Sequence, residues 1–319
     1  MEKENYHPIF PIRSARKSIY ATLAFFDIFD YPLTLNELTD VLLGELPSES
    51  HDVEATLTSD PLIEMKGPYF YLRGREKIIN TRHEHEQTAA KYWKRVKKIV
   101  PLLQMVPFVQ MVAVCNTLAF NNPNKESDID LFIVVKHGRL MLARMLSTIL
   151  FSILGVRRHG SKITERFCLS FYVTDQNLNL EKIQSPDDIY LAYWVAVLQP
   201  ILGEKMYQNF LAQNSWVKKF FRHDLKPNLK KLQKNSWLIS LGKAGEFILK
   251  GKIGDFFEKK LWNWQRKRHQ QNEQNLGLGS SVIINENMLK FHNIDRRQEF
   301  SEKFRKKFSE LVASSQGDF

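Results

Sequence analysis

The stretch Val112–Val135, which reads VAVCNTLAFNNPNKESDIDLFIVV, constrains the fold more than any other part of the chain. An apolar run leads into the polar turn Asn116-Thr117, a polar loop follows, and a second apolar run carries Asp128 and Asp130. Short apolar runs rich in Val and Ile are typical of buried strands. Because strand side chains alternate between two faces, the two aspartates point the same way. The opposite face of this strand carries Ile129, Leu131 and Ile133.

Two carboxylates on one face of a strand are unfavourable by themselves. Like charges this close repel and raise a pKa unless a cation lies between them. Carboxylate oxygens prefer hard cations such as Mg²⁺. A carboxylate pair can hold two ions about 3.5–4 Å apart, an arrangement that stabilises both oxygens of an in-line phosphoryl displacement. The pair Asp128 and Asp130 therefore predicts a magnesium site, and the alternative is a solvated acidic strand end in another α/β sheet.

These residues resemble the signature of the DNA polymerase β-like nucleotidyltransferase superfamily. In that signature a strand leads to a Gly-Ser or Gly-Gly turn that opens a helix, and an acid–apolar–acid strand follows about ten residues later. Here the ten residues Leu118–Ser127 separate Thr117 from Asp128. The resemblance implies that Asp128 and Asp130 are catalytic and bind one or two Mg²⁺ ions. It also implies that Asn116 and Thr117, in the places of the Gly and the Ser, hold a triphosphate together with Ser127.

The resemblance further implies a third carboxylate on the next strand. That strand is predicted at Arg166–Thr174, and alternation places Phe167, Leu169, Phe171 and Val173 on one face and Cys168, Ser170, Tyr172 and Thr174 on the other. No acid occurs inside it, so Asp175 at its end is the nearest candidate and Glu165 at its start is a weaker one. Arg157 and Arg158, just before the strand, are candidates to neutralise the phosphates.

The chain divides into four regions that predict an α+β protein. Residues 13–75 read as a winged helix, with helices near 15–29 and 50–58 and a hairpin at 62–72. Thr34 begins a second helix between them, with Glu37 three residues on in the spacing of a capping box. Residues 76–104 are predicted to form a polar linker helix. For residues 105–182 the resemblance implies a nucleotidyltransferase core, a small mixed sheet with helices. Residues 183–319 read as a basic helical domain, beginning with the apolar segment Asp187–Leu202.

The basic charge of the chain is concentrated at its C-terminal end. Residues 217–319 hold 22 Lys and Arg against 11 Asp and Glu, whereas residues 1–216 are balanced at 24 of each. This surplus indicates a polyanionic partner, whether nucleic acid, nucleotide or acidic membrane, unless it only solvates helix faces. Trp262 and Trp264 beside the basic run 266–269 would suit single-stranded nucleic acid, or they could anchor a helix.

The third helix of the predicted winged helix is poorly suited to DNA. It carries Glu49, Asp52 and Glu54 and no Lys or Arg between Ser48 and Ser59, so its surface would repel phosphates. An intramolecular or protein-docking role is the better interpretation of residues 13–75.

The motifs that the sequence lacks argue against a P-loop ATPase, a Rossmann oxidoreductase, an α/β hydrolase and a zincin. The sequence has no P-loop, Gly-x-Gly-x-x-Gly, Gly-x-Ser-x-Gly or His-Glu-x-x-His motif. The two cysteines, Cys115 and Cys168, have neither zinc-site nor disulfide spacing and read as buried thiols. No signal-peptide core or membrane span is evident, so a cytoplasmic protein without a membrane partner is expected.

The expected function is a Mg²⁺-dependent nucleotidyltransferase that moves an NMP from an NTP to a hydroxyl acceptor and releases pyrophosphate. The alternative is a catalytically degenerate regulator that senses nucleotides or binds nucleic acid.

Overall fold

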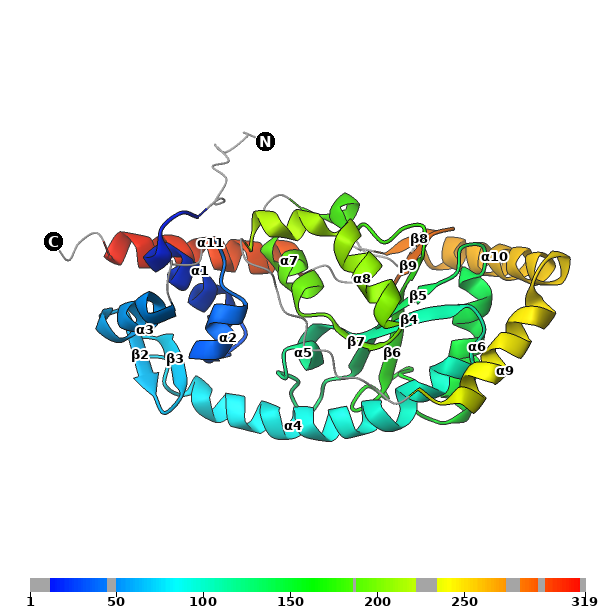
Figure 1. Ribbon diagram of the computed structural model, residues 1–319, viewed down its shortest axis with the longest axis horizontal. Helices are drawn as coiled ribbons and strands as arrows, with labels where there is room; N and C mark the ends of the chain where they lie inside the picture. Colours follow the sequence, from blue (N-terminus) through cyan, green and yellow to red (C-terminus); the bar gives the residue numbers. More distant parts are fainter. Residues whose placement is uncertain are drawn as a thin grey trace.

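The computed structural model describes residues 12–44, 50–185, 188–221, 234–273, 282–291 and 296–315, with the side chains of 50–52 and 268–273 left out. Within these residues the chain forms a mixed α+β structure with one three-stranded and one six-stranded sheet. Figure 1 shows the small sheet and its helices at one end of the long axis and the larger sheet beyond the middle. Among the described residues, no helix is long and apolar enough to cross a bilayer.

The N-terminal region contains the three-stranded sheet and the helices that pack around it. Its elements are α1 (Ala15–Asp27), β1 (Leu33–Thr34), α2 (Leu35–Asp40), α3 (Ser50–Ser59), β2 (Ile63–Lys66) and β3 (Tyr69–Leu72). The strand order is β1-β3-β2, and both pairings are antiparallel. The expected capping box starts α2, because the Thr34 hydroxyl accepts from Glu37 N at 3.3 Å and the Glu37 carboxylate accepts from Thr34 N at 3.0 Å.

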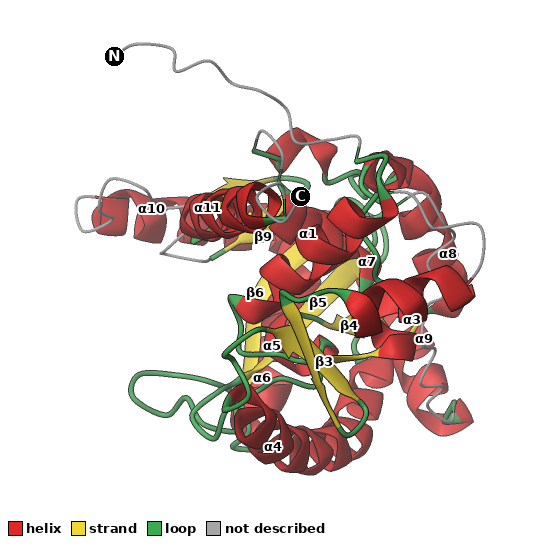
Figure 2. Ribbon diagram, turned by 90° about the vertical axis from the view of Figure 1, so that its left-hand side faces the viewer, coloured by secondary structure: helices red, strands yellow, loops and turns green. Residues whose placement is uncertain are grey.

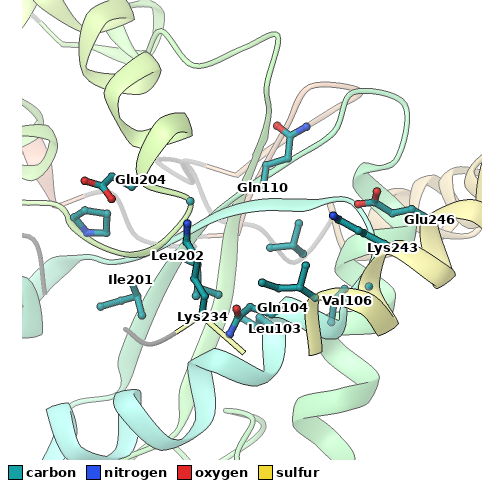
Figure 3. A pocket seen from close by; sticks show the side chains of 15 residues that line it. Leu103, Gln104, Val106, Gln110, Ile201, Leu202, Glu204, Lys234, Lys243 and Glu246 are labelled. Atoms are coloured by element: carbon teal, nitrogen blue, oxygen red, sulfur yellow. The ribbon is translucent and has the colours of Figure 1, made fainter. Parts of the chain in front are cut away.

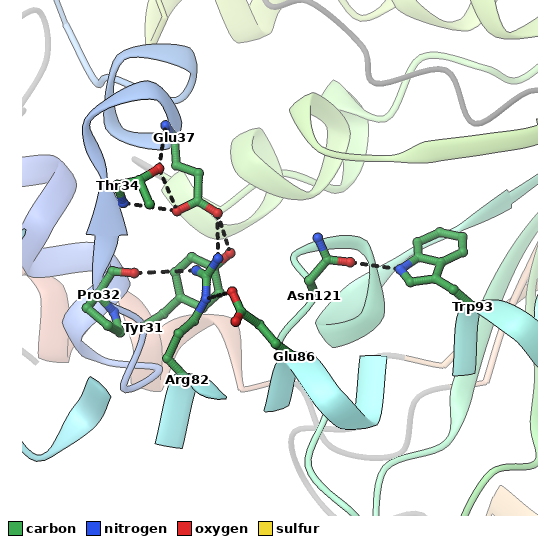
Figure 4. Close-up of polar contacts among 8 residues, drawn as sticks. All are labelled: Tyr31, Pro32, Thr34, Glu37, Arg82, Glu86, Trp93 and Asn121. Atoms are coloured by element: carbon green, nitrogen blue, oxygen red, sulfur yellow. Dashed lines mark hydrogen bonds and ion pairs between the residues drawn. The ribbon is translucent and has the colours of Figure 1, made fainter. Parts of the chain in front are cut away.

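A single long helix joins this region to the larger sheet. Helix α4 (Ile78–Ile99) passes along one side of the molecule and continues into a 3₁₀ segment, η1 (Val100–Met105). Near its start, the Arg82 side chain donates to Glu37 at 2.6 Å and to Glu86 at 2.7 Å and lies over the Tyr31 ring (Figure 4). Further along, Trp93 Nε1 donates to Asn121 Oδ1 at 2.8 Å. Helix α4 thus makes polar contacts near the three-stranded sheet through Arg82 and near the six-stranded sheet through Trp93.

The six-stranded sheet has the order β7-β4-β5-β6-β9-β8. Its strands are β4 (Val109–Val114), β5 (Ile129–Val135), β6 (Phe167–Thr174), β7 (Gln199–Leu202), β8 (Ile283–Asn285) and β9 (Met288–Lys290). Among the described strands, β5 and β6 are the one pair of neighbours that is parallel, and α6 (Leu140–Ile153) supplies the crossover that a parallel pair requires. The short helix α5 (Asn116–Ala119) lies between β4 and β5.

Both faces of the sheet are buried, in the alternation expected from the sequence. Ile129, Leu131 and Ile133 pack in a cluster with residues of α4 and α6. Phe132 and Val134 point the other way, into a cluster with α1, α7 (Ile189–Ala196) and α8 (Glu204–Gln213). Figure 2 shows the strands between these two sets of helices.

The alternation expected for the third strand is wrong from its middle onward. Asp130 pairs with Cys168 but Phe132 pairs with Phe171, so β6 contains one extra residue at that point. Such a bulge shifts every later side chain to the other face. As a result Phe167 packs on the α6 side, whereas Phe171 packs with Phe132 on the α7 side at 5.0 Å between ring centroids.

The boundary expected at residue 183 is also corrected. The C-terminal part is not a separate helical domain, because β7, β8 and β9 add three strands to the same sheet as β4, β5 and β6. The apolar segment expected as one helix divides into α7 and β7, with Pro200 in the edge strand, where a missing N–H is tolerated. The other C-terminal elements are η2 (Glu181–Ile183), η3 (Ser215–Lys219), α9 (Ser236–Leu249), α10 (Lys252–Glu273) and α11 (Arg297–Ser314).

The N-terminal region packs directly on the rest of the molecule. Helix α11 lies along α1 in both views (Figures 1 and 2). The rings of Phe25 in α1 and Tyr193 in α7 stack at 4.2 Å between centroids, and Tyr190 stacks on Phe300 of α11 at 5.2 Å. One apolar cluster therefore runs from α1 to the central sheet without interruption.

Candidate functional site

Two aspartates and a cysteine meet at one end of the parallel pair β5–β6. Asp130 lies in β5 and pairs with Cys168 of β6, while Asp128 directly precedes β5. One ligand atom from each of the three side chains lies within 4.8 Å of the others. The structure thus brings the two predicted aspartates together and adds a thiol that sequence reasoning had treated only as buried.

The carboxyl group of Asp130 is difficult to ionise in this position. Burial raises the pKa of Asp130 to about 7, and repulsion from Asp128 acts in the same direction. Hydrogen bonds from Asn116 and Cys168 and the charge of Arg158 oppose the rise without cancelling it. An additional cation at this point would favour the ionised form.

Arg158 is the cation that reaches the aspartates. Its guanidinium lies 2.6 Å from Asp128 Oδ2 and 3.8 Å from Cys168 Sγ. The Arg158 backbone N–H donates to Phe167 O at 2.9 Å, which fixes this residue beside β6. Burial and the two neighbouring carboxylates raise the pKa of the Cys168 thiol, so it carries its proton at neutral pH.

Arg157, the other predicted phosphate-neutralising residue, does not join this cluster. The charge of Arg157 acts on Tyr172, which lies on the opposite face of β6. Burial raises the pKa of Tyr172 to about 12, and Arg157 weakly opposes this rise. Adjacent residues of an extended segment point to opposite sides, so one arginine reaches the aspartates and the other does not.

The Asn116-Thr117 turn opens α5. Asn116 has φ of 55°, a region that asparagine tolerates better than most residues. Its side-chain oxygen accepts from Trp194 Nε1 at 2.9 Å, and its amide hydrogen-bonds to Asp130. Thr117 is exposed beside it. Asn116 is therefore a direct structural partner of the acidic pair.

Ser127 shapes the loop before the aspartates. Its hydroxyl donates to Asn124 Oδ1 at 2.8 Å and accepts from Asn124 N at 3.1 Å. Its carbonyl oxygen accepts from the Tyr92 hydroxyl at 2.9 Å and from Glu165 N at 3.1 Å. Ser127 therefore positions the loop against α4, and its hydroxyl is engaged within the loop.

Asp175, the predicted third carboxylate, lies at the wrong end of β6. Its backbone N–H donates to Val135 O, and its carboxylate accepts from His137 N at 2.9 Å and from Gln110 Nε2 at 3.0 Å. Six residues of extended chain lie between it and Cys168, which corresponds to about 20 Å. Glu165 pairs with Lys91 on the surface. The group that faces Asp130 is Cys168, and this pairing depends on the register of β5 and β6, which the sequence does not reveal.

Two cavities lie outside the acidic cluster. A small one of about 40 Å³ borders the Asn116-Thr117 turn and is walled mainly by aromatic rings, those of Phe25, Phe26, Phe29, Tyr31, Phe120 and Tyr190. A larger one of about 370 Å³ lies between η1, β7 and α9 (Figure 3). Gln110 lines it and also donates to Asp175, so this larger cavity belongs to the far end of the sheet.

The predicted tryptophan platform is divided. Trp262 is half-buried against the core cluster, whereas Trp264 is 53% exposed. Arg266 and Lys267 are exposed, and the side chains of Arg268 and His269 lie outside the described residues. The two rings therefore do not form a joint stacking surface.

Comparison with protein-family models, with curated proteins and with solved structures found no match for this chain.

Proposed function

We propose that the chain is a metal-dependent nucleotidyltransferase whose site is built on Asp128 and Asp130. The observation that carries this proposal is the convergence of both carboxylates within 4.8 Å of each other and of Cys168, beside a turn with positive φ at Asn116. The resemblance of residues 112–135 to the polymerase β-like signature supports the same reaction class.

The residues of the cluster fit Mg²⁺. Asp128 and Asp130 offer hard oxygen ligands, and the raised pKa of Asp130 indicates a position where a further positive charge is favourable. When bound, Mg²⁺ supplies neutralisation of phosphate charge in the transition state. Cys168 is a softer ligand and carries a proton, so the two aspartates are the residues that would hold this ion.

The neighbouring side chains have separate tasks in this proposal. Asn116 orients Asp130 through its amide, and Trp194 in turn holds the Asn116 side chain. Arg158 balances the charge of Asp128 and is placed to meet a phosphate oxygen. Thr117 offers an exposed hydroxyl at the turn. The acceptor hydroxyl would attack the α-phosphorus, the bond from that phosphorus to the β-phosphate oxygen would break, and pyrophosphate would leave.

Residues 13–75 are proposed to be a winged helix with a docking role. Their element order and antiparallel sheet β1-β3-β2 support that assignment. Helix α1 is covered by α7, where the rings of Phe25 and Tyr193 stack, and by α11, which favours an intramolecular role over DNA binding.

Nucleotide binding tests the proposal directly. Calorimetry with each of the four NTPs and Mg²⁺ is expected to show binding by the wild type and a more than tenfold loss in Asp128→Ala/Asp130→Ala, because phosphate charge is then no longer neutralised at the site. Asp175→Ala, at the far end of β6, is the matched control and should bind as the wild type does. Absence of Mg²⁺-dependent binding to every NTP would contradict the proposal.

A second candidate, a nucleotide-sensing regulator without transfer activity, is favoured by Cys168. A protonated thiol faces Asp130 where the resemblance implies a third carboxylate, and Asn116 places a β-carbon at the turn.

The variant Cys168→Asp separates these two candidates. If the wild type binds nucleotide without transfer and Cys168→Asp gains Mg²⁺-dependent pyrophosphate release, the natural protein is a sensor. If the wild type already transfers, Cys168→Asp is expected to change its rate, and Cys168→Ser, with similar size and no charge, serves as the control. A nucleic-acid-binding regulator would instead show binding that falls steeply with salt and needs no nucleotide.

A further inference from the structure

Helix α9 has two apolar faces, and only one of them is covered. On the inner face, Gly242 lies so close to η1 that a β-carbon there would come within 2.5 Å of Gln104 O. Leu238 is buried on the same side. On the outer face, Trp237, Leu241 and Ile248 follow one another at helical spacing and are 66%, 37% and 63% exposed. A soluble helix normally carries polar residues on that side.

Helix α10 repeats this arrangement. Its inner face includes Glu258, whose carboxylate accepts from Met141 N at 2.8 Å and Leu142 N at 2.9 Å at the start of α6. Its outer face carries Ile253, Phe256 and Phe257, which are 56%, 62% and 42% exposed. Phe247, just before the turn between the helices, is 69% exposed. Figure 1 shows the two helices meeting at the end of the long axis, opposite the C-terminus.

The charges around these exposed rings are unbalanced because the nearby acids are already engaged. Glu246 is half-buried and accepts from Phe108 N at 2.9 Å. Asp255 is exposed but pairs with Arg139 at 2.7 Å. Glu258 is buried. Four exposed lysines surround the turn, and none of them forms an ion pair among the described residues; they are Lys250, Lys252, Lys259 and Lys260. The Lys250 ammonium lies 4.1 Å from the centroid of the Phe247 ring.

We propose that this α9–α10 hairpin docks on an anionic phospholipid surface. Bulky apolar side chains flanked by lysines are the composition of interfacial helices, with the rings below the headgroups and the ammonium groups among the phosphates. The inference does not depend on the proposed transferase activity. It concerns attachment to the face of a bilayer, which requires no helix that spans it.

The same features disfavour the two other occupants. A second copy of the chain, applied by symmetry, would place the same lysines opposite one another, and like charges across an interface are unfavourable. Nucleic acid would satisfy the lysines, but exposed aliphatic side chains such as Leu241, Ile248 and Ile253 provide no stacking surface for bases.

Vesicle co-sedimentation of the full chain tests the proposal. The protein is expected to bind vesicles containing about 30% phosphatidylglycerol in phosphatidylcholine at least about tenfold more tightly than phosphatidylcholine alone. Phe256→Ser/Phe257→Ser should reduce this binding about tenfold or more, because the variant lacks two of the rings that would insert below the headgroups. Lys250→Gln/Lys252→Gln/Lys259→Gln should reduce it by about fivefold per lysine.

Matched controls lie outside the α9–α10 hairpin. Met65→Ser removes another exposed apolar side chain, and Lys94→Gln/Lys97→Gln/Lys98→Gln removes three exposed lysines of α4. Both should bind vesicles as the wild type does. Failure to bind anionic vesicles, equal binding to neutral ones, or equal losses in the control variants would overturn the proposal. The proposal would also be overturned if the chain formed a dimer that Phe256→Ser/Phe257→Ser dissociates. Binding of single-stranded DNA in place of vesicles, lost in the same hairpin variants, would overturn it too.

Discussion

Replacing Asp130 by Asn is expected to stabilise the protein above neutral pH. The pKa of Asp130 is raised to about 7, against about 4 in an unfolded chain. Between these values the folded state keeps a proton that the unfolded state loses, so the stability of the wild type falls as pH rises through this window. The amide that replaces this carboxyl group in the variant does not titrate. One pKa unit corresponds to about 1.4 kcal/mol, so a rise of this kind favours the variant by at least about 1 kcal/mol at pH 8.

The measurement is urea unfolding of both proteins at several pH values between about 5 and 8.5. The advantage of Asp130→Asn should be small at the acid end and complete above pH 7. Asp175→Asn is the matched control and should be less stable than the wild type, because Asp175 accepts hydrogen bonds from His137 N and Gln110. An equal pH dependence in wild type and Asp130→Asn would show that this carboxyl group ionises normally.

The same variant links stability to the proposed activity. Mg²⁺ is expected to raise the unfolding midpoint of the wild type and to leave that of Asp130→Asn unchanged, because an ion that binds only the folded state stabilises it. Transfer activity, where present, should fall more than about a hundredfold, since even outer-shell partners of metal ligands are worth tenfold to a hundredfold. A stabilised variant that kept full transfer would leave the pKa argument intact and contradict the metal-site proposal.

The acidic strand was predictable because local rules decide it. The alternation of Asp128, Ile129, Asp130 and Leu131 at the start of a short apolar run decides the faces of the strand, and β5 forms within that run at Ile129–Val135. The capping box at Thr34 and Glu37 is equally local.

The rest depends on contacts between distant parts of the chain. The bulge in β6 depends on how it pairs with β5, and one extra residue was enough to reverse the faces of Phe171 and Tyr172. The pairing of Cys168 with Asp130 lies before the bulge and depends on the register of the two strands. Strands β8 and β9 have three residues each, too few for a periodic signal. Residues 199–202 read as the end of a helix because they follow an apolar helix directly. Pairing with β4, which their own sequence does not reveal, makes them an edge strand.

Replacing Arg82 by Ala is expected to be the most destabilising charge deletion in the N-terminal half of the fold. The Arg82 side chain is only 5% exposed and donates to Glu37, to Glu86 and, at 3.4 Å, to the carbonyl of Pro32. Its guanidinium also lies 3.9 Å from the centroid of the Tyr31 ring. Through these contacts α4 is joined to the capping box of α2 and to the segment between α1 and β1 (Figure 4).

Deletion of this cation leaves two partly buried carboxylates close together without their counterion. Removing one partner of a buried ion pair costs about 3–5 kcal/mol, and we expect about 3 kcal/mol here because Glu37 and Glu86 retain some solvent. Arg82→Lys should recover part of this loss, since an ammonium keeps the charge but cannot bridge both acids in the planar geometry of a guanidinium. The free energy of unfolding in urea measures both effects.

Arg296→Ala provides the matched comparison for Arg82→Ala. Arg296 also pairs with a carboxylate through two N–H groups, at 2.8 and 2.9 Å from Glu299, but its side chain is 57% exposed. An exposed pair contributes little, so Arg82→Ala should be clearly more destabilising than Arg296→Ala although both arginines use two N–H groups at similar distances. If they had equal effects, the stabilisation by Arg82 would not depend on its burial, and the joint between α4 and the N-terminal region would rest on apolar packing alone.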